Sequence, residues 1–258
     1  MDSDQITEIF NKIANEKVHS NQELFINSFI DSIDLSSIRK DIHVDRKLLN
    51  SFEDINDHLA EISKKLAPNG YYISQAKTLE DWRIKNRLKL NSSFFKFYFR
   101  LSSFIFYRIV PRIGLLNFIK KSIFKSHKTL ISKAEILGRL AYSGFEIYNY
   151  QKINNSHIFI AKKISNPETK KVSEGPIFTQ RRIGKKGKII KVYKLRTMHP
   201  YSEYIHSYML SKHGFGTSGK IKDDFRMTRW AKIFRKYWLD ELPQILNVLK
   251  GDMKLVGL

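Results

Sequence analysis

The sequence predicts a mixed α/β chain built in two parts, and three observations lead to this fold class. Apolar residues at helical spacing alternate with short β-type runs over residues 46–164. A polar segment that contains a proline, 165–174, then interrupts this pattern and indicates a linker. Residues 175–258 have a different character, a cationic hairpin followed by helices. With 258 residues, 42% of them hydrophobic, the chain can bury a packed core, which excludes a disordered protein.

Each element of the first part has a local signal. The segment 46–66 carries an apolar residue at every third or fourth position, which predicts an amphipathic helix. A short strand over Tyr71–Ile73 is expected to follow it. The segment Ser132–Gly144 predicts a second helix, with Ser132 as the N-cap and Glu135 as its capping-box partner. Two more strands are expected on either side of a polar turn, Phe145–Tyr150 and His157–Ala161.

The net charge of +21 is concentrated in two segments. Residues 83–133 carry 13 Lys/Arg and residues 175–198 carry 8, and neither segment contains Asp or Glu. Two such surfaces indicate polyanionic partners, namely anionic lipid head groups, a pyrophosphate or nucleic acid. The chain has no cysteine, which excludes disulfides and thiolate metal sites. Its acidic start, MDSDQITEIF, lacks the apolar stretch of a signal peptide.

Residues 83–131 have the character of an insertion into the first part. Within them, Phe94–Val110 places cations on one half of a helical wheel and aromatic residues on the other. No uncharged run approaches the roughly 20 apolar residues that a spanning helix needs. We therefore expect a cationic amphipathic helix that lies in the plane of a membrane interface. The alternative is an ordinary helix that packs its aromatic side chains on the rest of the first part.

Three stretches of the first part resemble the C-terminal part of a class I methyltransferase-like domain. They are LAPNGYYI, SKAEILGRLAYSGFEIY and SHIFIAKKI, and the resemblance covers residues 46–164. A nucleotide-binding half of this kind needs a glycine-rich turn after its first strand, and the first glycine here is Gly70. We therefore expect a degenerate scaffold of helix and sheet over residues 1–164, with no bound S-adenosylmethionine.

The second part begins with two predicted strands, Ile177–Ile183 and Lys188–Met198, joined by a turn between two glycines. Their cations suit a diphosphate, because Arg forms a bidentate fork on phosphate oxygens and Lys supplies a point charge. A solvated basic hairpin and a nucleic-acid-binding ribbon are the alternatives. Further on, Asp224–Trp238 predicts an amphipathic helix with one basic face.

The most informative stretch is WLDELPQILNVLKGDMKLVG, in which Asp240 and Glu241 precede Pro243 and an apolar run. Proline is tolerated in the first turn of a helix and glycine is a usual stop, so Gly251 should end this helix. Both carboxylates should then lie at or just before the helix start, where positive backbone charge favours an ionised carboxylate and attracts phosphate. An Asp in this position can serve as a nucleophile toward phosphorus. The alternative is that Asp240 is an N-cap and Glu241 an ordinary first-turn charge.

Three motifs in order, GPIFTQRRIG, YKLRTM and DDFRMTRWAKIFRKYWLDELPQILNVLKGDMKLVG, resemble the bacterial sugar transferase family, the monotopic polyprenyl-phosphate phosphoglycosyltransferases. The resemblance covers residues 175–258. It implies that Asp240 attacks the β-phosphorus of a UDP-sugar, so that UMP leaves and the phosphosugar passes from Asp240 to polyprenyl phosphate. It also implies Glu241 as the acid/base partner and Mg²⁺ near Asp240. Four basic residues match family positions and are expected to bind phosphate: Lys194, Arg196, Arg226 and Arg235.

The chain departs from the family pattern in three places, the smallest of which is Ala231 where a glycine is common. A polar linker stands where the family has an apolar re-entrant helix, so the insertion around Pro111 is expected to make the membrane contact. The sequence ends at Leu258, before the family's Arg-Pro element and C-terminal amphipathic helices, which predicts either a fragment of a longer enzyme or an inactive product.

Together these features predict a sugar-1-phosphate transferase that initiates polysaccharide or glycan assembly. Its expected place is the cytoplasmic face of a bacterial inner membrane, in a peripheral or monotopic arrangement. The expected partners are a UDP-sugar, polyprenyl phosphate and an anionic membrane surface, with a homodimer left open. The alternatives are a basic nucleic-acid-binding protein and an inactive membrane-bound partner subunit. The nucleic-acid alternative has only charge in its favour, since no helix-turn-helix, zinc-finger or RNP signature is present.

Overall fold

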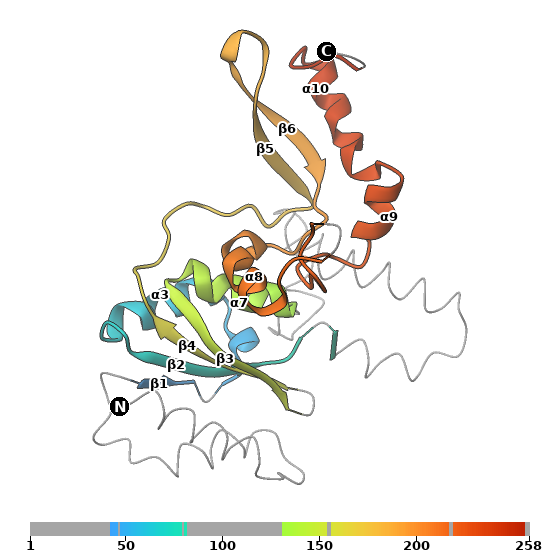
Figure 1. Cartoon of the computed structure of the whole chain (residues 1–258). Helices are drawn as coiled ribbons and strands as arrows, with labels where there is room; N and C mark the ends of the chain where they lie inside the picture. The colour runs from blue at the N-terminus through green and yellow to red at the C-terminus, as the bar shows by residue number, and fades with distance from the viewer. Residues whose placement is uncertain are drawn as a thin grey trace, which may run out of the picture. The chain divides into compact units, whose positions relative to one another are not determined.

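The structure is a computed structural model with mixed α/β architecture (Figure 1). Its described residues divide into two compact units, the first ending at Lys170 and the second beginning at Lys171, a division that falls inside the polar segment 165–174. In the part of the chain that the structure describes, no helix is both long and apolar enough to span a bilayer. The predicted membrane-surface insertion lies almost wholly outside the described residues, which are 42–45, 47–78, 80–81, 131–153, 156–216 and 219–255.

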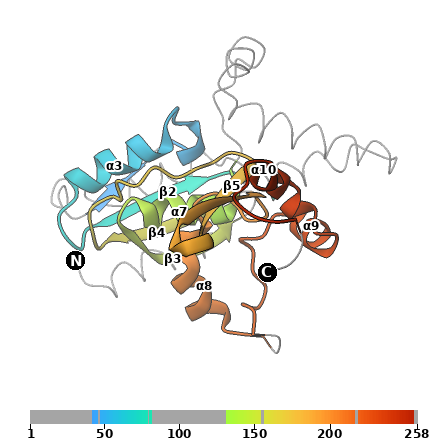
Figure 2. The same ribbon diagram turned by 90° about the horizontal axis from the view of Figure 1, so that it is seen from above.

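In the residues that the structure describes, the first unit is a four-stranded sheet with two main helices. The strands are ordered β1-β2-β4-β3, with β1 parallel to β2 and the other pairs antiparallel. Figures 1 and 2 show α3 and α7 on the same face of this sheet. Buried side chains from the two helices and the sheet form its core, among them Leu59, Ile62, Leu137, Leu140, Tyr72 and Phe159. In chain order the elements are β1 Ile42–Val44, η1 Leu49–Ser51, α3 Ile55–Lys65, β2 Tyr71–Ala76, α7 Lys133–Tyr142, β3 Phe145–Ile153 and β4 Ser156–Lys163.

The helix predicted over residues 46–66 is shorter than expected. It begins at Ile55, because the side chain of Asp54 accepts hydrogen bonds from the backbone N–H groups of Asn56 at 2.8 Å and Asp57 at 3.1 Å. Asp is a strong N-cap, and its side chain satisfies N–H groups that have no partner within the helix. The residues before it form only the 3₁₀ turn η1. The apolar spacing continues across this cap, so it predicts a longer helix than the one that forms.

The second predicted helix and its cap are confirmed. The hydroxyl of Ser132 accepts a hydrogen bond from the backbone N–H of Glu135 at 3.2 Å, and α7 follows directly.

The strands of the first unit extend further than predicted. Strand β2 continues beyond Ile73 through Ser74 and Gln75 to the end of its ladder with β4. Both of these polar residues are buried. Pairing with a neighbouring strand therefore overrides a local sequence that lacks apolar alternation.

That residues 1–164 share the fold of a methyltransferase-like domain remains a prediction. The described part of this region contains helices and a mixed sheet, as a scaffold of that kind requires.

The second unit begins with a hairpin in which β5 pairs antiparallel with β6. The turn places Lys186 and Gly187 at positive φ, 57° and 75°, and glycine takes up such a conformation without strain. The strand predicted over Ile177–Ile183 is confirmed, whereas its partner is shorter than Lys188–Met198. The elements are β5 Ile177–Ile183, η4 Lys185–Gly187, β6 Ile189–Leu195, η5 Ser202–Ile205, α8 His206–His213, α9 Ala231–Lys236, η6 Leu239–Gln244 and α10 Ile245–Leu249.

The long helix predicted over Asp224–Trp238 is wrong, since only α9 is helical in that range. The carboxylate of Asp224 accepts hydrogen bonds from the backbone N–H of Arg226 at 3.1 Å and from its guanidinium at 2.8 and 2.7 Å. The backbone N–H of Thr228 donates to the carbonyl of Thr197 at 2.9 Å instead of to a preceding helical turn. Asp side chains that bind their own local backbone compete with helix formation, so this segment is a turn held to the residues that follow β6.

A buried carboxylate in the first unit makes stability depend on pH. Asp45 accepts hydrogen bonds from His58 Nε2 at 2.8 Å, from His43 Nε2 at 3.3 Å and from the hydroxyl of Tyr72. Burial by itself raises the pKa of Asp45, but these hydrogen bonds outweigh it and lower the pKa from 3.8 to about 2. The carboxylate therefore binds its proton more weakly in the folded protein than in the unfolded chain.

We expect Asp45 to stabilise the protein above pH 4 and to lose that contribution as the pH falls toward 2. A shift of this size corresponds to on the order of 2 kcal/mol of unfolding free energy. Urea unfolding measured from pH 6 to pH 2 should show a steeper acid loss for the parent than for Asp45→Asn, which has no carboxylate to protonate. Parallel pH curves for the two proteins would contradict the assignment.

Candidate active site

The carboxylates predicted from sequence lie in the first turn of the helical segment formed by η6 and α10. Trp238 occupies the cap position, with a left-handed φ of 56°, and no side chain caps this end. The alternative in which Asp240 is the N-cap is therefore wrong. As predicted, Gly251 lies just past the end of the segment, with a φ of 74°, whereas Pro243 lies inside η6 and not in its first turn.

The structure pairs one of the two carboxylates with a predicted phosphate-binding cation. Lys194 on β6 donates to Glu241 Oε1 at 2.7 Å. The side chains of Lys194 and Glu241 are 27% and 33% exposed, so the pair lies at the surface and remains open to a ligand. An ion pair that is about one third exposed stabilises a fold only weakly, and its effect here is to fix where the Glu241 carboxylate lies.

Asp240, the other carboxylate, differs from its neighbour in having no partner. Its side chain is partly exposed. Within the described ranges, no hydrogen bond or ion pair engages its oxygen atoms. A carboxylate with free lone pairs can attack an electrophile or coordinate a cation without first breaking a contact. The two acids thus have different environments, one held by an ammonium group and one free.

Asn247 determines how the helical segment lies on the hairpin. Its side chain is fully buried. Its Oδ1 accepts from the backbone N–H of Tyr193 at 3.0 Å, and its Nδ2 donates to the backbone carbonyl of Lys191 at 2.7 Å. The amide thereby pairs with the edge of β6 as a neighbouring strand would, and it contacts Asp252 Oδ2 at 3.2 Å as well. Because of these bonds α10 runs beside β6 toward the hairpin turn, as Figure 1 shows.

Sequence reasoning missed Asn247, although a signal was present. It is the one polar residue inside the apolar run Ile245–Leu249. A buried amide in such a run needs hydrogen-bond partners outside its own helix, and here they are strand backbone groups. Lys250 adds a second link, since its Nζ donates to the hydroxyl of Tyr193 at 3.0 Å.

We expect Asn247→Ala to destabilise the second unit by about 2 to 4 kcal/mol, because it leaves the backbone N–H of Tyr193 and the carbonyl of Lys191 without their partner. Urea unfolding would measure the loss, and amide hydrogen exchange at Tyr193 should become faster. Leu249→Ala on the same helix is the matched control, since Leu249 is 78% exposed. Equal stabilities for the two variants would show that the Asn247 bonds do not hold α10 in place.

The other predicted phosphate ligands are engaged elsewhere in the second unit. Arg196 donates to the carbonyls of Gly175 at 2.9 Å and Ser173 at 2.5 Å, so it holds the chain that enters the hairpin. Arg226 is buried against Asp224, as described above. Arg235 donates to the hydroxyl of Thr197 at 2.9 Å. Of the four cations, the structure therefore brings Lys194 directly to the carboxylate pair, and the phosphate roles of the other three remain predictions.

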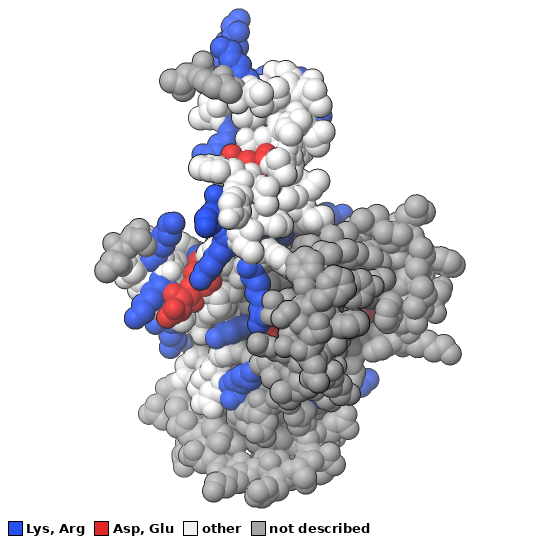
Figure 3. All heavy atoms as spheres, turned by 90° about the vertical axis from the view of Figure 1, so that its right-hand side faces the viewer, with Lys and Arg blue, Asp and Glu red and all other residues white. Residues whose placement is uncertain are grey.

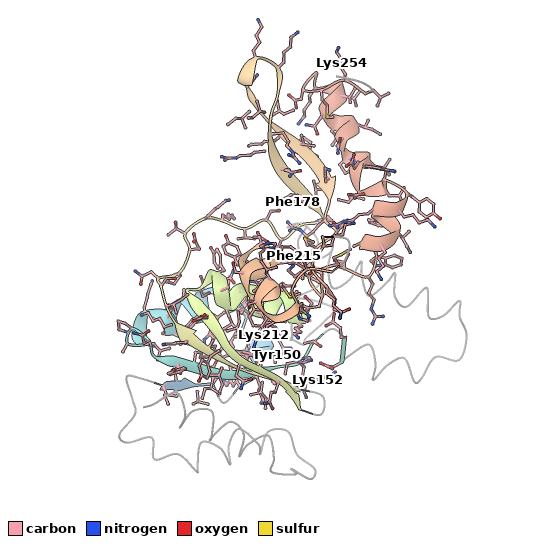
Figure 4. The ribbon with its side chains drawn as sticks, in the orientation of Figure 1. Tyr150, Lys152, Phe178, Lys212, Phe215 and Lys254 are labelled. Atoms are coloured by element: carbon pink, nitrogen blue, oxygen red, sulfur yellow. The ribbon has the colours of Figure 1, made fainter. Side chains whose placement is uncertain are left out.

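The hairpin itself presents a dense row of cations to solvent. Figure 4 shows Phe178 at its base and Lys254 at the far end of the neighbouring helical segment. Such a row raises the local concentration of anions near the carboxylate pair. The exposed cations of the hairpin are Arg181, Arg182, Lys185, Lys186, Lys188 and Lys191.

The carboxylates of this site fit a metal ion whose other ligands are mainly phosphate oxygens of the substrate. Among the described residues no group of three or more acidic or histidine side chains forms a ready-made metal cage. Mg²⁺ commonly binds through one or two carboxylates together with phosphate oxygens and water. The free carboxylate of Asp240 meets that requirement.

The C-terminal part of the chain is similar in sequence to known proteins. Residues 158–258 match the family described as bacterial sugar transferase. The chain is 44% identical over 92 residues to galactosyl transferase CpsE of Streptococcus agalactiae, a match that covers 35% of this chain and 20% of the relative. It is 44% identical over 88 residues to the UDP-N-acetylgalactosamine-undecaprenyl-phosphate N-acetylgalactosaminephosphotransferase of Aeromonas hydrophila, covering 33% and 18%. It is 40% identical over 89 residues to the undecaprenyl-phosphate galactose phosphotransferase of Salmonella typhimurium, covering 32% and 19%. The chain thus spans about a fifth of the length of these relatives.

Proposed function

We propose, from the membership of residues 158–258 in the bacterial sugar transferase family, that this chain carries the catalytic region of a sugar-1-phosphate transferase. The donor would be a UDP-sugar and the acceptor polyprenyl phosphate, so that the reaction begins the assembly of a glycan on a lipid carrier. Relatives named as undecaprenyl-phosphate sugar phosphotransferases support this reaction class. The observation that carries the proposal is the free Asp240 carboxylate beside the Lys194–Glu241 ion pair.

The proposed chemistry has two displacement steps at one phosphorus atom. An oxygen of the Asp240 carboxylate attacks the β-phosphorus of the UDP-sugar, the bond from that phosphorus to the bridging oxygen breaks, and UMP leaves. The sugar phosphate is then held on Asp240 as an acyl phosphate. A phosphate oxygen of polyprenyl phosphate attacks the same phosphorus, and the bond to Asp240 breaks and restores the carboxylate. Glu241 would accept the proton that a protonated acceptor phosphate releases.

Both steps bring anions together, and the site must reduce their repulsion. The ammonium group of Lys194 and the cations of the hairpin provide positive charge near the reacting phosphates. Asp240 would help to hold Mg²⁺, and the ion would supply further neutralisation when bound. Because Lys194 already contacts Glu241, its charge is placed beside the carboxylate pair before any substrate arrives.

The direct test of this function is UMP release. The protein should release UMP from one member of a UDP-sugar panel when undecaprenyl phosphate and Mg²⁺ are present, and the lipid should gain the sugar phosphate. The nucleic-acid alternative makes the opposite prediction. Nanomolar binding to duplex DNA, with no UMP release and no binding to lipid vesicles, would favour that alternative.

We also expect the chain to bind anionic vesicles in a salt-dependent way. Residues 83–133 and the hairpin carry the excess of cations, and the Debye length is only about 10 Å at 0.1 M salt. Co-sedimentation with vesicles that contain phosphatidylglycerol should therefore weaken as the salt concentration rises. Equal binding to neutral and anionic vesicles would contradict this expectation.

A further inference from the structure

A connected set of polar side chains lies at one end of the sheet of the first unit, and the chemistry proposed for the second unit does not use it. The ladder of β3 with β4 pairs Lys152 with His157, and Tyr150 is diagonal to His157 on the same ladder. Diagonal positions are within reach of aromatic side chains. Figure 4 shows Tyr150 and Lys152 toward this end of the sheet. His157 and Asp81 are buried, whereas Tyr150 is partly exposed.

Three of these side chains are arranged as a nucleophile, its base and an orienting acid. The hydroxyl of Tyr150 is hydrogen-bonded to His157 Nδ1, and His157 Nε2 lies 2.5 Å from Asp81 Oδ2. Because an ionised carboxylate can only accept, Nε2 carries the proton and Nδ1 accepts from the tyrosine. Thr78 holds the acid, since its hydroxyl and its backbone N–H donate to Asp81 Oδ2 at 2.6 and 3.3 Å. A hydroxyl bound to a base that a third group orients is the arrangement of an activated nucleophile.

The charge states of the base and the acid suit proton transfer from the tyrosine. Burial lowers the pKa of His157 and outweighs the opposite effect of Asp81, so the imidazole is neutral near pH 7 and can accept a proton. Burial by itself raises the pKa of Asp81, but hydrogen bonds from Lys152 and Thr78 help to outweigh it, and the pKa is lowered. The carboxylate therefore stays ionised and can stabilise the imidazolium that forms.

Two lysines place positive charge around these three residues. Lys133 Nζ lies 4.2 Å from the centroid of the Tyr150 ring, and Lys152 Nζ lies 2.5 Å from Asp81 Oδ1. Figure 3 shows Lys and Arg at many places on one face of the molecule, so positive charge by itself identifies no site. The particular feature here is a cation over the ring of a tyrosine that has a base on its hydroxyl. A cation in that position favours the phenolate that loss of the proton leaves.

We propose that Tyr150 is a nucleophilic tyrosine that accepts an acyl group from an acyl phosphate. The phenolic oxygen attacks the carbonyl carbon, and the phenolic proton passes to His157 Nδ1. The bond from the carbonyl carbon to the phosphate oxygen breaks, inorganic phosphate leaves, and Tyr150 is left as an ester. Lys152, whose side chain is 44% exposed, can neutralise the leaving phosphate.

The residues at this end of the sheet favour an acyl phosphate over a nucleoside triphosphate as the donor. Phosphoryl transfer from a triphosphate commonly relies on Mg²⁺ that carboxylates help to hold. Here the Asp81 carboxylate is already engaged by Thr78, His157 and Lys152. An acyl phosphate releases a single phosphate, for which nearby lysines supply enough positive charge.

N-acetylimidazole, a neutral acetylating reagent, tests the reactivity of the hydroxyl on the whole chain. With limiting reagent, peptide mass mapping should find Tyr150 acetylated about 10²-fold faster than Tyr148, because a positioned base contributes typically 10²–10⁴-fold. Tyr148 is the internal control, since it is partly exposed on the same strand and packs edge-on against the ring of Tyr71. Equal rates at the two tyrosines would overturn the proposal.

Acetyl phosphate tests the class of donor. Tyr150 should gain an acetyl group that hydroxylamine removes, as expected of a tyrosine ester and not of an acetylated lysine. Acetylation of lysines alone would overturn the proposal, and so would a phosphoryl group on Tyr150 in place of the acetyl group.

Two variants separate the base from the cation. His157→Gln should lower the rate at Tyr150 with both reagents to that of Tyr148, and an unchanged rate would overturn the assignment of the base. Unfolding of this variant would instead raise the rate at Tyr148, so Lys152→Met provides a second test that keeps the base. It should slow the reaction with acetyl phosphate about ten-fold and leave that with N-acetylimidazole unchanged. An unchanged rate with acetyl phosphate, or equal losses with the two reagents, would contradict the role of Lys152 toward the phosphate.

Lys212→Met is the matched control for Lys152→Met, because Lys212 is an exposed lysine of the second unit (Figure 4). It should change neither rate. None of these readouts uses a UDP-sugar or a lipid, so their outcome is independent of the function proposed for the second unit.

Discussion

Replacing Asp240 with Asn should lower turnover by several powers of ten and leave stability almost unchanged. Removal of a covalent nucleophile has effects of this size, because an amide cannot form the acyl phosphate. The structure predicts little loss of stability, since no hydrogen bond or ion pair of the Asp240 carboxylate would be broken within the described part of the chain. The remaining term is the interaction of its charge with the helix start, which is at most about 1 kcal/mol.

Intact-protein mass spectrometry would measure the covalent step separately. With UDP-sugar and Mg²⁺ but no polyprenyl phosphate, the parent should gain the mass of one phosphosugar, and Asp240→Asn should not. Asp223→Asn is the matched control, because Asp223 is exposed in the same unit and Asn tolerates its left-handed φ of 49°. If Asp240→Asn still gained the label, the nucleophile would be another residue.

Replacing Glu241 with Gln should lower turnover by about 10²- to 10⁴-fold, the range for loss of a proton-transferring group. The variant should still gain the phosphosugar label, more slowly, because Asp240 remains in place. It also removes the ionic partner of Lys194, which is joined to Glu241 at 2.7 Å.

Lys194→Met separates the two roles of Glu241. This variant removes the ion pair and keeps the carboxylate. If Glu241 transfers a proton, Lys194→Met should retain more turnover than Glu241→Gln. If both variants lost turnover equally, the contribution of Glu241 would be to place Lys194, and the proposed proton transfer would be wrong.

The sequence predicted those parts of the fold and the site that depend on neighbouring residues. Ser132 caps α7 as expected, because a cap needs only the N–H groups of the next turn. The strand Ile177–Ile183 and its glycine-bounded turn were likewise predicted. The place of Asp240 and Glu241 near a helix start followed from Pro243 and Gly251, which act on backbone within one turn.

Errors arose where a side chain competes with the regular backbone pattern. Asp54 caps α3 within an apolar periodicity that continues through it. Asp224 binds Arg226 and turns a segment whose apolar spacing suits a helix. In both cases the periodicity was real, but a carboxylate supplied hydrogen bonds that the helix could not match.

Only the tertiary structure decided how the two acids differ. Lys194 and Glu241 are 47 positions apart, and Asn247 meets the backbone of Lys191 and Tyr193 across 56 and 54 positions. No local rule connects residues so distant in sequence, because their contact depends on how α10 lies against β6. The sequence by itself determined that two carboxylates stand together at the start of a helix. The packing of that helix on the hairpin determined that one carboxylate is held by a lysine while the other is free. The hydrogen bonds of Asn247 to the edge of β6 fix the position of the helix on the hairpin, and this brings Glu241 to Lys194.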